Sequence, residues 1–169
     1  IIPNEGYLET AEFFFRNIEK KFCSKDIFHS YSEDISFIED YAYIIQCLLD
    51  LSDATMNTKY RLLAKKYCDL AIIKFYDSNK YIFQKNDKSK NDIFMNPIDI
   101  SDNTLPNANS IMLINFSRLG YTNEAKELSN SLNGYLNIYK NFMISSLKAL
   151  DFFNEINSGK NCNTEGCQI

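Results

Sequence analysis

The sequence contains no tryptophan, a single histidine, three prolines and five glycines among its 169 residues. Because glycine and proline are scarce and hydrophobic residues make up 45% of the chain, disordered and low-complexity classes are excluded and a globular helical chain is expected. The lone histidine, His29, excludes any mechanism that needs two imidazole groups. No apolar run approaches the roughly 20 residues that cross a bilayer, so no membrane span is expected.

Basic surface is also missing. The net charge is -4 and no block of basic residues occurs, which argues against a nucleic-acid or anionic-membrane partner. The lysine-rich stretch KNDKSKN is interrupted by Asp87 and Asn91, and we interpret it as a solvated loop. The chain starts with Ile-Ile-Pro and shows no signal-peptide pattern, so we expect a fragment or a processed chain.

The five cysteines, without a secretory signal, predict a reducing compartment and a cytoplasmic location. Cys23, Cys47 and Cys68 fall on or beside apolar helical faces and are interpreted as small buried side chains. Cys162 and Cys167 are close enough in sequence to bridge, but a zinc ion needs two further ligands. We therefore predict no metal and no cofactor.

Hydrophobic periodicity predicts six helices that alternate between two kinds. Their approximate ranges are 5–23, 36–51, 60–75, 107–119, 122–133 and a segment around 142–153. The first, third and fifth carry one apolar stripe each, which is typical of outer helices, and the others are apolar on most sides. The stripe predicted for the first helix comprises Tyr7, Leu8, Ala11, Phe14, Phe15, Ile18 and Phe22.

Breaks separate these helices. The segments YIFQKND and DIFMN flank a polar turn and predict a short β-hairpin near residues 80–95. Pro97 and Pro106 prevent helix formation between them, and Gly120 is expected to end the fourth helix. We predict an all-α domain of three helical hairpins over residues 1–156, followed by a flexible cysteine-containing tail over 157–169.

The long polar loops all precede inner helices, so antiparallel packing places them at one end of the molecule. This predicted rim collects His29, Tyr31, Glu39, Asp40, Tyr41, Asp99, Asp102, Asn107, Asn109, Tyr135 and Tyr139. Carboxylates, amides and aromatic rings together are typical of a sugar site, with Glu39 or Asp40 as the acid or base. The same residues also suit structural roles, since Glu39 and Asp40 complement a helix dipole and Asp102, Asn107 and Asn109 suit turns and caps.

Three segments carry a family resemblance. SFIEDYAYIIQCLLDL, KYRLLAKKYCDLAIIKFYD and NPIDISDNTLPNANSIMLINFSRLG resemble the C-terminal region of the thioredoxin-domain-containing spermatogenesis-associated protein family. The family's FLEDYA falls on residues 37–42, its DGAxPSGNS on 102–110, and its terminal CxxxxCQ on Cys162, Cys167 and Gln168. The family's RPK is replaced by Asn96, Pro97 and Ile98, and two motif glycines are replaced by Asn103 and Ala108.

The resemblance implies an (α/α)6 toroid related to six-hairpin glycosidases and N-acylglucosamine 2-epimerases. This chain has no CxxC motif and only three predicted hairpins, which is about half of such a toroid. Half a toroid exposes apolar surface on its flanking hairpins, so we expect self-association or docking with a chain that supplies the missing hairpins.

The resemblance further implies a carbohydrate or another polar metabolite as ligand, bound at His29, Tyr41, Asp99, Asp102, Asn107, Asn109 and Tyr139. We do not expect the isolated half to be catalytic. The alternative function is a helical-repeat module for protein–protein interaction.

Overall fold

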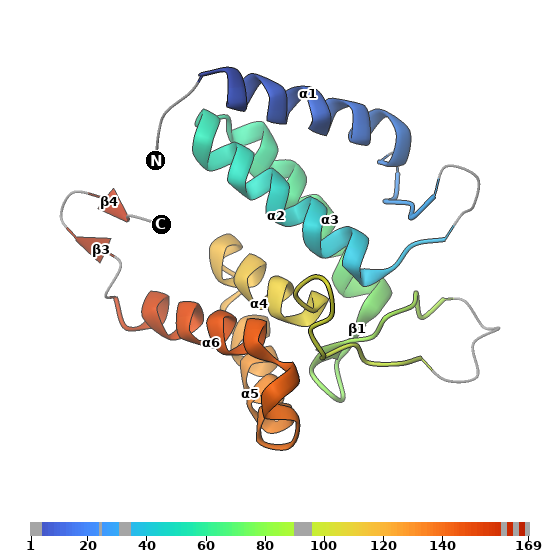
Figure 1. The fold of residues 1–169 in the computed structure, drawn as a ribbon, viewed down its shortest axis with the longest axis vertical. Helices are drawn as coiled ribbons and strands as arrows, with labels where there is room; N and C mark the ends of the chain where they lie inside the picture. Colours follow the sequence, from blue (N-terminus) through green and yellow to red (C-terminus); the bar gives the residue numbers. More distant parts are fainter. Residues whose placement is uncertain are drawn as a thin grey trace. The chain divides into compact units, whose positions relative to one another are not determined.

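The structure is a computed structural model that describes residues 5–23, 25–30, 35–89 and 96–159, together with the backbone of 162–163 and 166–167 (Figure 1). The fold is all-α with a short β-hairpin, as the sequence predicts. The chain divides into two compact units. Unit 1 comprises Ile1–Phe75 and Lys85–Asn96, and unit 2 comprises Tyr76–Gln84 and Pro97–Ile169.

Unit 1 contains three long helices: α1 (Glu5–Phe22), α2 (Ile38–Thr55) and α3 (Thr58–Phe75). Helices α2 and α3 pack side by side, joined by a turn in which Met56 adopts a left-handed conformation (φ 55°). Helix α2 is buried on most sides, and α3 buries one stripe of residues, so the inner and outer predictions for these two helices are confirmed.

Aromatic rings form the centre of this unit. The fully buried Tyr41 ring lies edge-on to Phe75 at 5.2 Å and to Tyr67 at 6.4 Å between ring centroids. Such edge-to-face pairs add to the free energy gained from burying the apolar area. The α2–α3 pair is therefore anchored at α2's first turns by rings from α3.

The predicted burial of α1 is wrong along one edge of its stripe. Phe15 is buried, but Tyr7, Phe14 and Ile18 are exposed. The Phe15 ring packs edge-on against Tyr60 at 5.9 Å, and the Tyr60 hydroxyl donates a 2.8 Å hydrogen bond to Glu12. These contacts turn the Phe15 edge of the stripe inward, and the other edge faces outward.

Unit 2 starts with a short antiparallel hairpin, in which β1 (Tyr76–Asp77) pairs with β2 (Ile82–Phe83). A short β-hairpin is therefore present, as predicted, and it pairs β1 with β2, a strand that lies within the predicted segment YIFQKND. Of DIFMN, only Asn96 lies within the described residues. The Asp77 carboxylate accepts hydrogen bonds from the backbone N–H groups of Asn79 and Lys80, which closes the turn close to Tyr76 and sets this earlier register.

The helices of unit 2 are α4 (Ala108–Leu119), α5 (Thr122–Tyr139) and α6 (Ile144–Asn157), with a 3-10 turn, η1 (Lys140–Phe142), before α6. Helix α4 packs against both α5 and α6 and is buried over most of its length, as predicted for an inner helix. Helix α6 is buried through Ser146, Ala149 and Leu150, whereas Ile144 and Leu147 are exposed, so its inner character is confirmed only in part.

The C-terminal segment contains two more short strands, β3 (Cys162–Asn163) and β4 (Gly166–Cys167). They pair antiparallel, with Cys162 opposite Cys167 in the backbone register. Residues 160–161, 164–165 and 168–169 of the predicted tail lie outside the described residues.

Gly120 ends α4 in the left-handed conformation (φ 83°) and its N–H donates a 2.9 Å hydrogen bond to the Phe116 carbonyl. The predicted helix stop at Gly120 is confirmed. Gly134 lies inside α5, and a Cβ added at either glycine meets no atom within 4 Å. The two glycines therefore differ in backbone conformation and not in available space.

We predict that Gly120→Ala lowers the free energy of unfolding by about 1 kcal/mol, because an alanine Cβ disfavours the left-handed conformation. Gly134→Ala is the matched control and should raise it by about 0.5 to 1 kcal/mol, because alanine has the higher helix propensity. Chemical denaturation of both variants checks the opposite signs. Equal effects at the two positions would contradict the role assigned to Gly120.

Candidate functional site

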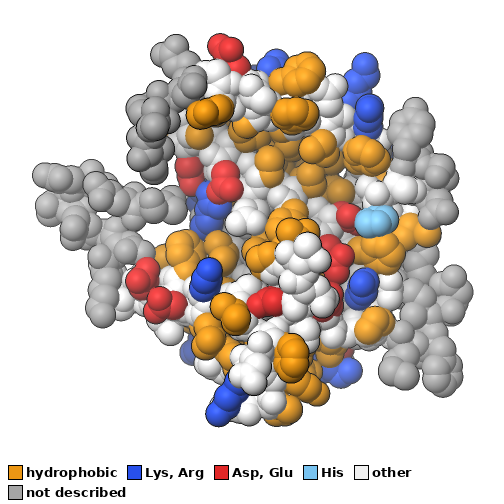
Figure 2. Space-filling model, viewed as in Figure 1, with side chains coloured by type: hydrophobic (Ala, Val, Ile, Leu, Met, Phe, Trp, Pro, Cys, Tyr) orange, Lys and Arg blue, Asp and Glu red, His pale blue; other side chains and the backbone are white. Residues whose placement is uncertain are grey.

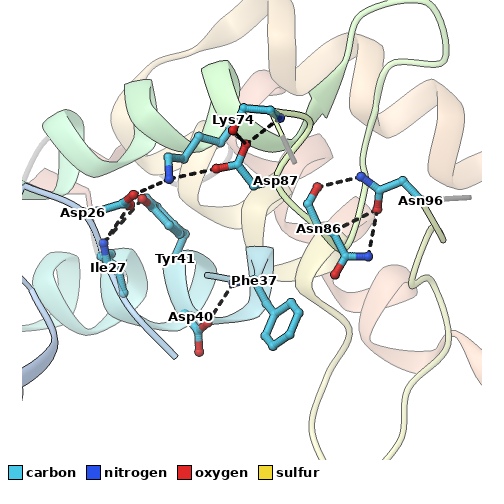
Figure 3. Close-up of polar contacts among 10 residues, drawn as sticks. Asp26, Ile27, Phe37, Asp40, Tyr41, Lys74, Asn86, Asp87 and Asn96 are labelled. Carbon is cyan, nitrogen blue, oxygen red and sulfur yellow. Dashed lines mark hydrogen bonds and ion pairs between the residues drawn. The ribbon is translucent and has the colours of Figure 1, made fainter. Parts of the chain in front are cut away.

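The start of α2 is fixed by a side chain of its own first turn and by the 85–86 segment of unit 1. The backbone N–H of Phe37 donates a 2.9 Å hydrogen bond to Asp40 Oδ2 (Figure 3). The backbone N–H of Ile38 donates at 3.2 Å to the carbonyl of Lys85, and Phe37 also forms an isolated β-bridge with Asn86. The N–H groups at a helix start have no partner within the helix, so these contacts stabilise α2 and hold the 85–86 segment beside it.

The structure brings His29 and Asp40 together. His29 Nδ1 lies 3.0 Å from Asp40 Oδ1, and the imidazole ring stands edge-on to the Phe37 ring at 4.9 Å. The His29 side chain is 54% exposed. With Nδ1–H donating to the carboxylate, Nε2 is the ring nitrogen that can accept a further hydrogen bond, and Asp40 fixes the ring's tautomer and orientation.

Glu39 lies in the same helical turn as Asp40 and forms a 3.7 Å ion pair with Lys85. The Lys85 ammonium also lies over the Phe37 ring, 5.9 Å from its centroid. Both members of the ion pair are 38% exposed, so solvent screens their attraction and the pair contributes little to stability. We refer to His29, Phe37, Glu39, Asp40 and Lys85 as the α2 cluster.

The loop that carries His29 is held by a part-buried ion cluster. Lys74 Nζ, near the end of α3, lies 2.9 Å from Asp87 Oδ2 and also binds Asp26 (Figure 3). The other oxygen of Asp26 accepts a 2.9 Å hydrogen bond from the N–H of Ile27, a residue that is 1% exposed. Lys74 therefore ties the 25–30 loop and the 87–89 turn to α3.

The charges of this cluster stabilise one another. Burial alone raises the pKa of Asp87, but hydrogen bonds from Ser89 and Lys74 outweigh it and the pKa of Asp87 is lowered. Burial alone lowers the pKa of Lys74, but hydrogen bonds to Asp26 and Asp87 outweigh it and that pKa is raised. The ammonium and the Asp87 carboxylate therefore stay charged across the neutral range.

In unit 2, the Asp102 carboxylate accepts four hydrogen bonds. Oδ1 accepts from the Asn107 backbone N–H at 3.0 Å, from Asn107 Nδ2 at 2.9 Å and from the Ser145 hydroxyl. Oδ2 accepts from the Ser145 backbone N–H at 2.7 Å. Burial raises the pKa of Asp102, but the hydrogen bonds from Ser145 and Asn107 outweigh it and the pKa is lowered. Asp102 thus caps the first turn of α6 from a loop 43 residues earlier.

Asn107 extends this network to the start of α4. Its side-chain oxygen accepts from the Ser110 backbone N–H at 2.9 Å, which is the N-cap hydrogen bond of α4. Its amide nitrogen donates to Asp102 and to the hydroxyls of Ser145 and Ser146. The Ser110 and Ser146 hydroxyls are 2.7 Å apart, so the first turns of α4 and α6 are joined by buried polar contacts.

Asn109 is fully buried and pairs with backbone groups. Its side-chain oxygen accepts from the Phe83 N–H at 2.8 Å, and its amide nitrogen donates to the carbonyls of Phe83 at 3.0 Å and Asp99 at 3.1 Å. The amide therefore acts as an extra peptide group that holds β2 and the Asp99 backbone against α4.

The other predicted site residues have varied positions. Tyr41 is buried in the core of unit 1, where its hydroxyl accepts a 3.4 Å hydrogen bond from the Ile27 N–H. In unit 2, Asp99 and Tyr135 are half-buried and Tyr139 is exposed at the end of α5. Tyr31 lies outside the described residues. The binding roles of all these residues stay predictions.

Sequence reasoning missed Lys85, Lys74 and Ser145. Lys85 belongs to KNDKSKN, which the sequence predicts to be a solvated loop. The composition of that segment does not show that Lys85 pairs with Glu39 or that Asp87 pairs with Lys74. Lys74 falls among the polar residues of an amphipathic helix. Of the three, only Ser145 could have been found from the sequence. It lies in the first turn of the sixth helix, where free N–H groups attract a capping carboxylate.

Cys23 and Cys47 do not offer an activated nucleophile. Burial and the nearby Glu19 charge raise the pKa of Cys23 to about 11, and burial with Asp50 raises that of Cys47. Thiols with raised pKa values stay protonated and unreactive near neutral pH.

Neither a metal-ligand cluster nor a membrane-spanning helix occurs in the part of the chain that the structure describes. No three side chains among its His, Cys, Asp and Glu residues gather closely enough to hold a metal ion. None of its helices has both the length and the apolar content required to cross a lipid bilayer.

Comparison with known proteins finds no family profile that matches the chain. The chain is 31% identical over 98 residues, 58% of its length, to an uncharacterised protein of Caenorhabditis elegans, B0495.5. The matched segment is 13% of that protein, so the chain spans a small part of its relative.

We predict that Lys74→Ala lowers the free energy of unfolding by about 3 kcal/mol, because it leaves the buried Asp87 carboxylate without its cation. Lys65→Ala, at an exposed position of the same helix, is the control and should change stability by less than about 0.5 kcal/mol. Urea denaturation checks both variants, and a Lys74 variant as stable as the control would contradict the cluster's role.

Asp102→Ala should lower the free energy of unfolding by about 2 kcal/mol, because Asn107 and the Ser145 N–H lose their acceptor. Since the folded pKa of Asp102 is lowered, its contribution is present above the unfolded pKa of about 3.9 and is lost as the pH falls through the folded value. Unfolding curves at several pH values should show the difference from wild type shrinking on acidification. Asp151→Ala, at an exposed position of α6, is the control, and a pH-independent difference would refute the capping role.

Proposed function

We propose that this chain is part of a helical toroid of the thioredoxin-domain-containing spermatogenesis-associated type and that it binds a carbohydrate or another polar metabolite. The observation that carries the proposal is the α2 cluster. It combines an oriented imidazole, a solvent-accessible carboxylate, an ammonium group and an aromatic ring within unit 1. Sugar and metabolite sites use such hydrogen-bonding groups beside a ring face.

Two features support the toroid assignment. The helices follow the order that the resemblance implies. Residues at the motif positions 102–110 form hydrogen bonds that hold other elements of unit 2. Asp102, Asn107 and Asn109 connect the loop before α4 to the first turn of α6 and to β2. A motif with these contacts suits a scaffold element of unit 2 rather than a set of reacting groups.

Within the α2 cluster, the roles follow from the contacts. Both oxygens of Asp40 are engaged, one with His29 and the other with the Phe37 N–H, so Asp40 acts as a positioning residue. His29 and Glu39 then contact the ligand's hydroxyl groups, and the Lys85 ammonium contacts a phosphate group where the ligand carries one. The isolated chain binds its ligand, and turnover depends on the hairpins that a partner supplies.

The test is a thermal-shift panel of monosaccharides, oligosaccharides and sugar phosphates. A true ligand at about 100 times its Kd adds about 2.7 kcal/mol to the stability of the protein. His29→Ala and Glu39→Gln should abolish that shift, whereas Asp53→Asn, near the opposite end of α2, should retain it. Absence of stabilisation by every member of the panel would reject the proposal for this chain.

The second function is a helical-repeat module for protein interaction. It is favoured by the apolar side chains that α1 exposes in unit 1 and that η1 and α6 expose in unit 2. Large exposed apolar patches mark interaction sites in soluble proteins. Binding through these helices does not depend on Glu39 or Asp102, which separates the two functions by experiment.

A further inference from the structure

Helix α1 presents an apolar stripe that no described residue of the chain covers. Tyr7 is 71% exposed, Phe14 60% and Ile18 39%, and Ala11 between them is also exposed. Hydrophobic side chains gather at the top of Figure 2, the region that α1 occupies in Figure 1. We refer to Tyr7, Ala11, Phe14 and Ile18 as the α1 stripe.

The stripe is displayed by a helix that is held in place. Phe15 is buried against Tyr60, and Glu12 accepts the Tyr60 hydrogen bond, so the rotation of α1 about its axis is fixed from the opposite edge. Exposing two aromatic rings and an isoleucine on a fixed helix costs solvation free energy that burial elsewhere would recover. The exposed stripe is therefore suited to pack against a partner helix.

The spacing of the stripe points to the partner. Its residues are separated by four, three and four positions, an order that is the same in both directions along the helix. When two such helices pair antiparallel about a two-fold axis, Ala11 of each lies opposite Phe14 of the other, and Tyr7 lies opposite Ile18. Each large ring then faces a smaller side chain, as packing into the holes of a facing helix requires. We propose that α1 is a homotypic interface, which pairs antiparallel with α1 of a second copy of this chain.

Charge favours the antiparallel arrangement. The last turn of α1 carries Lys20 and Lys21, and a parallel pair would place these lysines of the two copies side by side. The antiparallel pair separates them by the length of the helix and opposes the two helix dipoles. A closed two-fold pair also uses the same surface on both copies and leaves no open end for further growth.

The apolar area that the two α1 helices bury indicates how stable the dimer is. Aromatic side chains bury about 150 to 250 Å² each, so the exposed fractions give about 350 Å² of apolar stripe per copy. A symmetric pair then buries roughly 700 Å² of apolar stripe, less than the 1,200 Å² typical of stable complexes. The dimer is therefore a weak and reversible one.

This inference deepens the interaction function and names its partner. It does not depend on the α2 cluster, because the α1 stripe and the α2 cluster share no residue. The thermal-shift panel therefore tests ligand binding, and the association measurement tests the dimer. A failed panel would leave the dimer intact, and a monomeric chain would leave ligand binding intact.

Sedimentation velocity over a concentration series tests the proposal. Wild type should show concentration-dependent dimerisation, and Phe14→Glu should weaken it at least about tenfold, since a charge is placed at the centre of the contact. Leu62→Glu, at an equally exposed apolar position of α3, is the matched control and should dimerise like wild type. A wild-type chain that stays monomeric at every concentration, or equal weakening by both variants, overturns the proposal.

A charge-pair rescue tests the orientation. Ala11→Glu and Phe14→Lys should each weaken self-association, and a mixture of the two variants should form heterodimers. In the antiparallel pair the new glutamate faces the new lysine, whereas a parallel pair leaves both without a partner. Circular dichroism confirms that each variant keeps its helices. A mixture no more associated than the separate variants refutes the antiparallel pair.

Discussion

The helices α2, α4 and α6 depend on polar groups, some local and some from distant loops, that satisfy the backbone N–H groups of their starts. The N–H groups at a helix start cannot be satisfied within the helix, so a buried start needs external acceptors. Asp40 and the Lys85 carbonyl supply them for α2, and Asn107 supplies one for α4. Asp102 supplies one for α6 across 43 residues of sequence. Each unit is thereby fixed at the ends where its loops are longest.

This constraint separates the polar residues into two groups. In unit 2, Asp102 and Asn107 form capping hydrogen bonds. Asn109 bonds to backbone groups and has no exposed surface. In unit 1, Asp40 serves the helix with one oxygen and His29 with the other, so capping and ligand chemistry share a side chain. In the α2 cluster, polar groups remain accessible after the requirements of helix capping are met.

Much of the fold could be predicted from the sequence, because periodicity determines which residues share a helical face. The bounds of α1 to α4 follow the predicted ranges closely, and Gly120 ends α4 as expected. Which edge of the α1 stripe is buried depends on Tyr60, 48 residues after Glu12, and no local pattern contains that contact. Likewise, His29 and Asp40 were both candidates, but their pairing depends on the path of the loop between them. Nor does a sequence distinguish a capping Asp102 from a ligand-binding one, because its partner Ser145 is distant.

The Asn109 side chain also protects one edge of the β1–β2 hairpin. A two-stranded hairpin offers a free edge, and an unpaired strand edge is a template for intermolecular β-pairing and aggregation. The Phe83 N–H and carbonyl, which do not serve the pairing with β1, are both bonded to the Asn109 side chain. One buried amide therefore closes the outer edge of β2 in the way that a third strand would, and that edge cannot pair with a strand of another molecule.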